Sequence, residues 1–434
     1  MAILAHKQPT MKNEYSQLLF DVQKKSNITV NNVKELKLLK EEIDYVLNAS
    51  IGYNTLRRMF GFLEKREPNI STLNKIANYL GYSSYSNYKN HKNIYYDWYF
   101  QQNLLKIINN KKIEINHINE INKGISNENN IVYLGYFINF YIEKNDITTI
   151  IFIFKHINFE RVNSTQLQKM GIVISLILSS LTEKKALKIY EALIPYDNFR
   201  NNVPLLNIDY LNLSSRYYKI IQLIHKNNAN SSDLFFSTLM FKYKEYYIDT
   251  INSHTEIKKP KEFDNFHYTL KGRYYGTLLL LNKDNNEQIK KDITIECAKN
   301  KVSYFLIEII PALIFIEEII FLEKILNKYY EEVFEGELWS SETTNAIYLI
   351  GLANVNLFAN KLQNARRNLD LIDLEKVEIG YYEYIKLFYY LTNLKISYKE
   401  NDIMANKLTS KNLQKCILKT KFNRFSLELK KYTI

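Results

Sequence analysis

The residues whose types and spacing best fit a chemical task lie near the N-terminus, in the segment 51–61. Its apolar residues Leu56, Met59 and Phe60 recur at helical spacing and predict a short amphipathic helix. The opposite face of that helix carries four polar residues: Tyr53, Asn54, Arg57 and Arg58. Arginine presents a planar fork of N–H donors to guanine edges or phosphate oxygens, and Asn and Tyr can contact bases or phosphates. These four side chains therefore predict a DNA-binding surface.

Local signals predict where this helix and a second one begin and end. Gly52 is the expected N-cap of the first helix, and Gly61 is the expected terminating glycine. Ser71, which follows Pro68, is the expected N-cap of the second helix, and Gly81 is its stop signal. One face of the second helix is apolar: Leu73, Ile76, Ala77 and Leu80. The pair has the layout of a DNA-reading helix and a helix that braces it.

Basic charge is concentrated in this part of the chain. Residues 1–90 contain 13 Lys and Arg and 8 Asp and Glu, whereas the whole chain contains 58 and 46. The net positive charge per residue is therefore more than twice as dense here as in the rest of the chain. Such a basic excess is expected where a small helical module contacts phosphates. A solvated, lysine-rich surface is the alternative, because the whole chain is rich in Lys, Asn, Ile and Tyr.

Residues 33–90 resemble the lambda-repressor-like (XRE-type) helix-turn-helix domains, in particular a variant found in Bacteroidetes-type bacteria. The phrases that carry the resemblance are Tyr53-Asn-Thr-Leu-Arg-Arg-Met-Phe-Gly61 and Ser71-Thr-Leu-Asn-Lys-Ile-Ala-Asn-Tyr-Leu-Gly-Tyr82. The resemblance implies that Tyr53 to Phe60 is the recognition helix. It also implies a bracing core formed by Leu73, Ala77 and Leu80.

One feature departs from that family. The preceding helix, expected at about Val33 to Leu47, is followed by Asn48-Ala-Ser-Ile-Gly52, which is longer than the usual tight turn. The small residue of the first helix and the glycine of the turn are not clearly placed. The angle at which the recognition helix would enter a groove therefore stays open.

The remaining chain predicts an all-α fold with two regions. At 434 residues the chain exceeds one typical domain, and only 11 Gly and 6 Pro interrupt it. We expect a helix-turn-helix domain at residues 1–92 and a large α-helical array at residues 93–434. Helices are expected at about 183–195, 347–358, 361–372 and 381–391, with breaks near 198–204, 258–262 and 282–287. The apolar stretches 171–181 and 304–320 are expected to be buried helices.

The helices of residues 93–434 resemble degenerate tetratricopeptide (TPR) hairpins in pattern, without the full repeat signature. An N-terminal DNA reader followed by such an array is similar to the peptide-sensing regulators of the Rgg and PlcR kind. That architecture implies a homodimer whose array binds a peptide, a protein or a small ligand. Five residues could line a peptide groove, although helix packing is the more ordinary role for each: Tyr274, Tyr275, Tyr348, Asn354 and Asn356.

Nothing in the sequence predicts an enzyme. It contains no phosphate-binding loop and no His-Glu-x-x-His motif, and the glycine pair Gly272 and Gly276 lacks the Lys-Ser/Thr that a phosphate loop needs. Cys297 and Cys416 match no metal-ligand spacing, so we expect neither a metal nor another cofactor. We expect a soluble cytoplasmic protein with no membrane contact, since no signal peptide or membrane span is recognisable.

The sequence therefore predicts a sequence-specific transcriptional regulator that binds double-stranded DNA and senses a peptide, protein or small ligand. The alternative is a non-enzymatic interaction scaffold, for example in phage or stress response, whose N-terminal helical domain binds protein. Binding to duplex DNA distinguishes the two.

Overall fold

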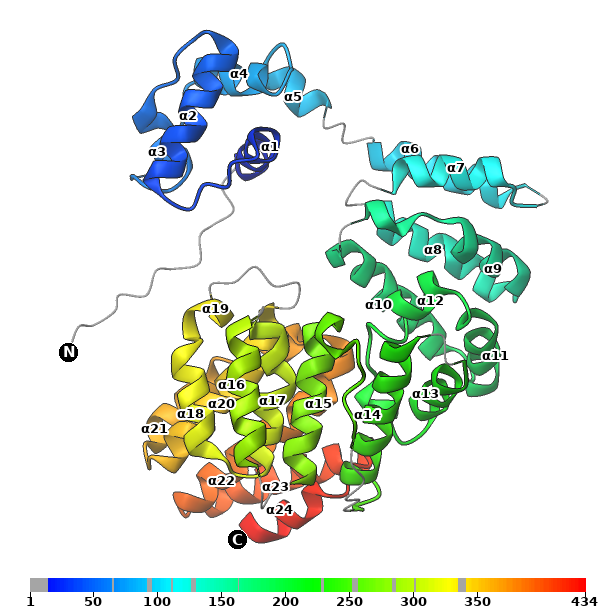
Figure 1. The fold of residues 1–434 in the computed structure, drawn as a ribbon, viewed down its shortest axis with the longest axis vertical. Helices are drawn as coiled ribbons and strands as arrows, with labels where there is room; N and C mark the ends of the chain where they lie inside the picture. The colour runs from blue at the N-terminus through cyan, green and yellow to red at the C-terminus, as the bar shows by residue number, and fades with distance from the viewer. Residues whose placement is uncertain are drawn as a thin grey trace. The chain divides into compact units, whose positions relative to one another are not determined.

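The computed structural model describes residues 15–64, 66–91, 96–110, 112–125, 130–162, 164–227, 230–251, 257–282, 286–299, 302–334 and 341–434. In these residues every regular element is helical and none is a strand (Figure 1). The expected all-α class with a large helical array is confirmed.

The chain divides into two compact units, Met1–Asn103 and Leu104–Ile434. The first unit contains α1 (Ser16–Ser26), α2 (Val33–Leu47), α3 (Tyr53–Met59), α4 (Ile70–Tyr79) and α5 (Tyr85–His91). The boundary between the units falls inside α6 (Tyr96–Ile108). The expected boundary, between residues 92 and 93, lies among residues that are not described.

The second unit is an array of helices: α7 (Ile115–Gly124), α8 (Asn130–Glu143), α9 (Ile147–His156), α10 (Ser164–Ser180), α11 (Glu183–Leu193), α12 (Asp197–Asn202), α13 (Arg216–Asn227), α14 (Ser231–Tyr247), α15 (Tyr268–Leu281), α16 (Glu287–Lys299), α17 (Val302–Phe315), α18 (Ile319–Lys328), α19 (Tyr330–Phe334), α20 (Ser341–Phe358), α21 (Leu362–Asp370), α22 (Ile379–Lys399), α23 (Ile403–Thr420) and α24 (Phe425–Tyr432). Short 3₁₀ turns add η1 (Phe159–Arg161), η2 (Tyr210–Asn212), η3 (Phe263–Asn265) and η4 (Leu374–Lys376). Many helices pack on the helix two places along, as α8 does on α10, α9 on α11 and α15 on α17.

The C-terminal end of this unit also packs on its middle. The ring of Tyr210 in η2 stacks on Tyr384 of α22, with ring centroids 4.3 Å apart. The backbone N–H of Arg424 donates to the carbonyl of Tyr247 at 3.0 Å, at the end of α14. The ring of Tyr247 stacks on Phe422, with centroids 5.3 Å apart. Segments about 175 residues apart in sequence therefore share one aromatic core.

A buried ion pair lies in that core. Arg273 of α15 donates from Nη2 to Glu308 Oε1 of α17 at 2.6 Å, and the two side chains are 2% and 1% exposed. The hydroxyl of Tyr381 donates to the same carboxylate at 2.8 Å, and the hydroxyl of Tyr210 donates to it at 3.3 Å. Burial raises the pKa of both tyrosines well above its ordinary value, so they remain donors. The buried carboxylate thus has hydrogen bonds from three donors.

Most of the expected helices form, and their lengths differ from expectation. The helix expected at 183–195 is α11, which ends at Leu193, whereas 347–358 and 381–391 are parts of the longer α20 and α22. The break expected near 198–204 is partly wrong, because α12 occupies Asp197–Asn202. Its residue Arg200 is 1% exposed and pairs with Asp197 and with Asp233 of α14, which holds this short helix in place.

The five possible groove residues are mainly core residues. Tyr274, Tyr275, Tyr348 and Asn354 are buried, and Asn356 is half-buried. Asn354 donates from Nδ2 to Thr392 Oγ1 of α22 at 2.8 Å, which joins two packed helices. These side chains therefore stabilise helix packing and do not line an open groove.

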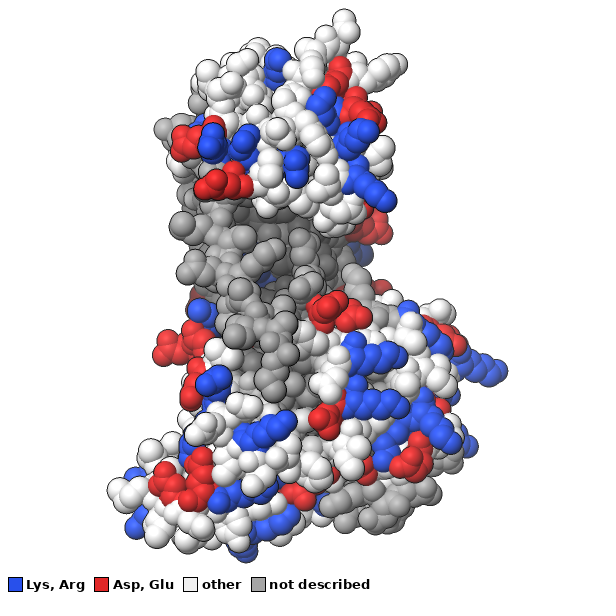
Figure 2. All heavy atoms as spheres, turned by 90° about the vertical axis from the view of Figure 1, so that its left-hand side faces the viewer, with Lys and Arg blue, Asp and Glu red and all other residues white. Residues whose placement is uncertain are grey.

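Charged side chains of both signs are spread over the surfaces of both units on the face that Figure 2 shows. In the part of the chain that the structure describes, no helix is both long enough and apolar enough to cross a membrane.

Gly272 and Gly276 place α15 against α17. A Cβ atom at Gly272 would lie 2.3 Å from the carbonyl oxygen of Phe305, and one at Gly276 would lie 2.6 Å from that of Glu308. Both distances are far inside van der Waals contact, so the two backbones approach closely only because these residues lack side chains. The glycine pair serves helix packing in this structure.

We predict that Gly272→Ala lowers the stability of the C-terminal unit by about 1–3 kcal/mol, because the added methyl group would overlap a backbone oxygen that cannot move alone. Gly351→Ala is the matched control, since its Cβ would meet side-chain methyl groups of Leu326 and Ile310 at 3.1 and 3.2 Å, a much smaller overlap than at Gly272. Thermal unfolding followed by circular dichroism compares the two variants. Equal transition temperatures for both would contradict the close-packing argument.

Candidate nucleic-acid interface

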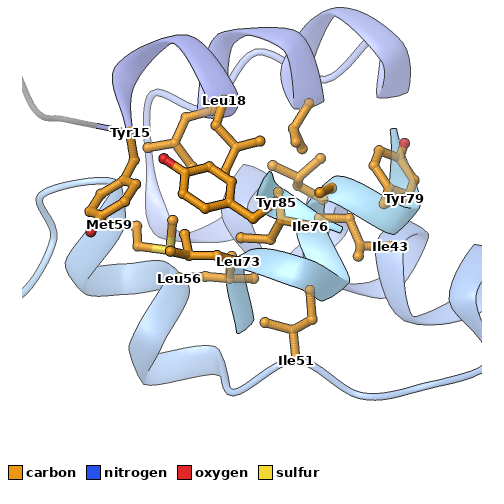
Figure 3. Close-up of a cluster of buried hydrophobic side chains, with 14 of the residues drawn as sticks. Tyr15, Leu18, Ile43, Ile51, Leu56, Met59, Leu73, Ile76, Tyr79 and Tyr85 are labelled. Carbon is orange, nitrogen blue, oxygen red and sulfur yellow. The ribbon is translucent and has the colours of Figure 1, made fainter. Parts of the chain in front are cut away.

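The helix that carries the four predicted DNA-binding residues is anchored in the core of the N-terminal unit. Leu56 and Met59 of α3 are 1% and 4% exposed and pack among side chains of the neighbouring helices (Figure 3). The other labelled core residues come from α1 and its N-cap residue, α2, the α2–α3 turn, α4 and α5: Tyr15, Leu18, Ile43, Ile51, Leu73, Ile76, Tyr79 and Tyr85. Burying each large apolar side chain contributes about 1.5–3 kcal/mol relative to leaving it exposed. The core therefore fixes which face of α3 is turned outward.

The turn between α2 and α3 is organised by the side chain of Asp44. Its carboxylate accepts the backbone N–H of Ile51 at 2.9 Å and the hydroxyl of Ser50 at 3.2 Å, and it pairs with Lys40 one turn earlier. Asn48 has a φ of 48°, the left-handed conformation that asparagine tolerates better than most residues. Asn48 thus takes the place of the glycine that the sequence seemed to lack, and Asp44 stabilises the longer turn.

Two further hydrogen bonds tie α3 to its neighbours. Lys75 of α4 donates from Nζ to the carbonyl of Ser50 in the turn at 2.8 Å. The hydroxyl of Tyr53 donates to the carbonyl of Val33, at the first turn of α2, at 3.1 Å. The N-terminal end of α3 is therefore held by both α2 and α4.

The C-terminal end of α3 is closed by Gly61, as expected. Gly61 has a φ of 80°, and the N–H groups of Phe62 and Gly61 donate to the carbonyls of Arg57 and Arg58 at 2.8 and 3.2 Å. This pattern is a Schellman motif, which satisfies the last carbonyls of the helix. It closes α4 as well, where Gly81 has a φ of 98°.

The start of α4 differs from expectation. Asn69, and not Ser71, is the N-cap, because the Asn69 side chain accepts the N–H of Thr72 at 2.7 Å. Ser71 lies inside the first turn of the helix. Asn and Ser are about equally good N-caps, so the choice depends on where the chain leaves the extended conformation.

The structure places the four predicted residues on α3 with unequal exposure. Asn54 is exposed, whereas Tyr53, Arg57 and Arg58 are half-buried. The guanidinium of Arg57 lies 5.9 Å from the centroid of the Tyr53 ring, and its Nε is buried without a hydrogen-bond partner. Arg58 makes a long hydrogen bond to the carbonyl of Asn54, at 3.4 Å. The other guanidinium N–H groups of Arg58 and the amide of Asn54 are the groups most ready to meet a ligand.

Sequence reasoning missed the residues that position α3. Asp44, Asn48 and Lys75 were not singled out, and α1 was not expected. The capping box of α2 was a detectable signal, since Asn32 accepts the N–H of Glu35 and the Glu35 carboxylate accepts the N–H of Asn32. The contacts of Lys75 with Ser50 had no such signal, because they join residues 25 apart.

Other kinds of site find no support among the described residues. No group of three or more His, Cys, Asp or Glu residues there could hold a metal ion. Both cysteines are buried, and burial raises the pKa of Cys297 to about 12 and that of Cys416 to about 11. Their thiols are therefore protonated and unreactive at neutral pH.

Comparison with known proteins found no family model, no curated protein and no solved structure that matches this chain.

We predict that Asp44→Ala lowers the stability of the N-terminal unit by about 1–3 kcal/mol at pH 7, because it leaves the N–H of Ile51 without its acceptor. Asp44→Asn keeps an acceptor oxygen and should cost less. Thermal unfolding of the two variants and the parent chain measures both effects.

The effect of Asp44→Ala should depend on pH. Burial raises the pKa of Asp44, but the hydrogen bonds from Lys40, Ile51 and Ser50 together lower it below its ordinary value. A lowered folded pKa gives stability that is present above the unfolded value of about 4 and lost as the pH falls through the folded value. The difference between parent and variant should therefore shrink below about pH 4, and a constant difference would exclude this role.

Proposed function

We propose that the N-terminal unit is a helix-turn-helix DNA-binding domain, with α2 and α3 as its two helices and α3 as the recognition helix. The chain is then a transcriptional regulator that binds double-stranded DNA. The observation that carries this proposal is the placement of α3. This short helix is closed at its C-terminal end by Gly61 and tied by hydrogen bonds to α2 and, through the α2–α3 turn, to α4. Its outer face presents Asn54 and Arg58. Arginine and asparagine are the side chains most suited to bidentate contacts with guanine and adenine.

The four predicted residues have two different roles in this proposal. Tyr53 positions α3 through its bond to Val33, and the Tyr53 ring supports the guanidinium of Arg57. Arg58 and Asn54 supply contacts to the DNA. The basic excess of residues 1–90 favours approach to the phosphate backbone at any sequence.

The C-terminal unit is the proposed sensing and dimerisation part. In this proposal its helices form a TPR-like array that binds a peptide or a protein, and a homodimer would match a two-fold symmetric operator. Half-site symmetry in DNA selected by the full chain from a random duplex pool reports both the operator and the dimer. An asymmetric single site would contradict the dimer.

We predict that the Arg57→Ala/Arg58→Ala variant binds the selected duplex at least about tenfold more weakly, because a bidentate contact from Arg58 contributes about 1–3 kcal/mol and the positive charge of Arg57 beside it is lost as well. Fluorescence anisotropy of the labelled duplex at several salt concentrations measures the affinity. The slope of log affinity against log salt should also become shallower, because two positive charges are removed from the surface that faces the DNA.

The matched control is Lys184→Ala/Lys185→Ala, which removes two adjacent positive charges from α11 in the other unit. It should leave both the affinity and the salt slope unchanged. An equal loss of affinity in both double variants would mean that the chain binds DNA through its general positive charge. That result would overturn the assignment of α3 as the recognition helix. Failure of the full chain to select any duplex would favour the protein-binding scaffold.

A further inference from the structure

A cleft of about 590 Å³ opens in the C-terminal unit, between α10, the beginning of α22 and the segment that runs from α12 to α13. Its volume lies in the range of small-molecule sites. Much of its wall is apolar: Ile172, Leu176, Ile208, Leu211, Ile379 and Tyr382. Gly380 lets α22 approach this segment, since a Cβ there would lie 2.3 Å from the carbonyl oxygen of Ile208.

Three residues that line the cleft carry buried oxygen atoms without a hydrogen-bond donor: Asn207 Oδ1, Glu378 Oε2 and Glu383 Oε2. The orientation of the Asn207 amide is supported by its Nδ2, which donates to the carbonyls of Asn202 and Val203. The Glu383 side chain is 6% exposed, and Lys386 Nζ lies 3.8 Å from its Oε2, beyond hydrogen-bond distance. Unsatisfied buried acceptors are costly, and three such oxygen atoms belong to residues that line this one cleft.

Glu378 is the carboxylate without a counterion. In the described part of the chain no ion pair joins it, and Gln168 donates to its Oε1 at a long 3.5 Å. Glu378 is the N-cap residue of α22, yet its side chain accepts no N–H of that helix. Burial raises the pKa of this carboxyl to about 7, as expected for a group that lacks a cation.

The other charged side chains that line the cleft already have partners. These pairs are Glu183 with Lys219, Asp209 with Arg216, and Glu383 with Lys419. The cleft therefore holds one negative charge more than its own residues balance when Glu378 is ionised.

We propose that this cleft binds a small primary amine with an apolar body, whose ammonium group lies against Glu378 and Asn207. An ammonium group has three N–H donors and no acceptor, which complements a wall of unpartnered acceptors. Its positive charge supplies the counterion that Glu378 lacks, and the apolar body covers Ile172, Leu176 and Leu211. The role of this ligand as the effector of a regulator rests on the proposed function, whereas its binding does not.

The test is a titration of the full chain with 2-phenylethylamine at pH 8, where Glu378 is mostly ionised, followed by ligand-observed NMR. The matched probes are 2-phenylethanol, which lacks the charge, and phenylacetate, which reverses it. We expect the amine to bind at least tenfold more tightly than either probe. We also expect Glu378→Gln to weaken amine binding at least tenfold while leaving binding of the alcohol unchanged.

A second variant keeps the test independent of the Glu378 substitution. Leu176→Trp adds bulk at a wall residue that is 42% exposed and should block the amine with Glu378 intact. Leu371→Trp, at a residue 66% exposed and outside the cleft, should leave amine binding unchanged. Equal binding of amine and alcohol, or amine binding that survives both Glu378→Gln and Leu176→Trp, would overturn the proposal.

The titration contains no DNA, so its failure leaves the assignment of α3 standing. Conversely, loss of DNA binding in the full chain would remove the regulatory role and leave an amine site that binds as expected.

Discussion

The ion pair between Arg273 and Glu308 is the constraint on which the C-terminal unit depends. Both charges are almost fully removed from water, which costs several kcal/mol per ion unless each charge is paired and hydrogen-bonded. The hydroxyls of Tyr210 and Tyr381 complete the shell of the carboxylate. Three helices and the η2 turn must therefore lie in one arrangement at once. A shift of α15 or α17 would separate the two charges, and a shift of α22 or η2 would remove a hydrogen bond from the buried carboxylate.

The proposed amine cleft lies next to this constraint in the chain. Glu378, Gly380 and Tyr381 are neighbours at the beginning of α22, and they respectively face the cleft, pack on Ile208 and bond the carboxylate of Glu308. An occupant of the cleft would thus contact a helix whose position the core fixes. A ligand in the cleft could therefore affect helix packing through α22, which contributes residues both to the cleft and to the buried ion-pair cluster.

In the N-terminal unit the stability of α3 depends on its neighbours, because a helix of seven residues is not stable in isolation. Its stability comes from Leu56 and Met59 in the core, from the Asp44 turn and from the Schellman motif at Gly61. Polar side chains have two different roles at α3. Tyr53 and Lys75 hold the helix in place, and Arg58 and Asn54 remain available on its surface.

The sequence by itself determined the local features of this protein. The all-α class, the extent of α2, the start of α11, and the terminating glycines Gly61 and Gly81 follow from periodicity, composition and the conformational freedom of glycine, which act within a few residues. Only the tertiary structure decided the use of Gly272 and Gly276 for helix packing, the burial of Tyr274 and Asn354, and the lack of a counterion at Glu378. Each of these depends on which distant segments lie side by side, because a charge or a close contact is defined by its neighbours in space and leaves no periodic trace in the chain.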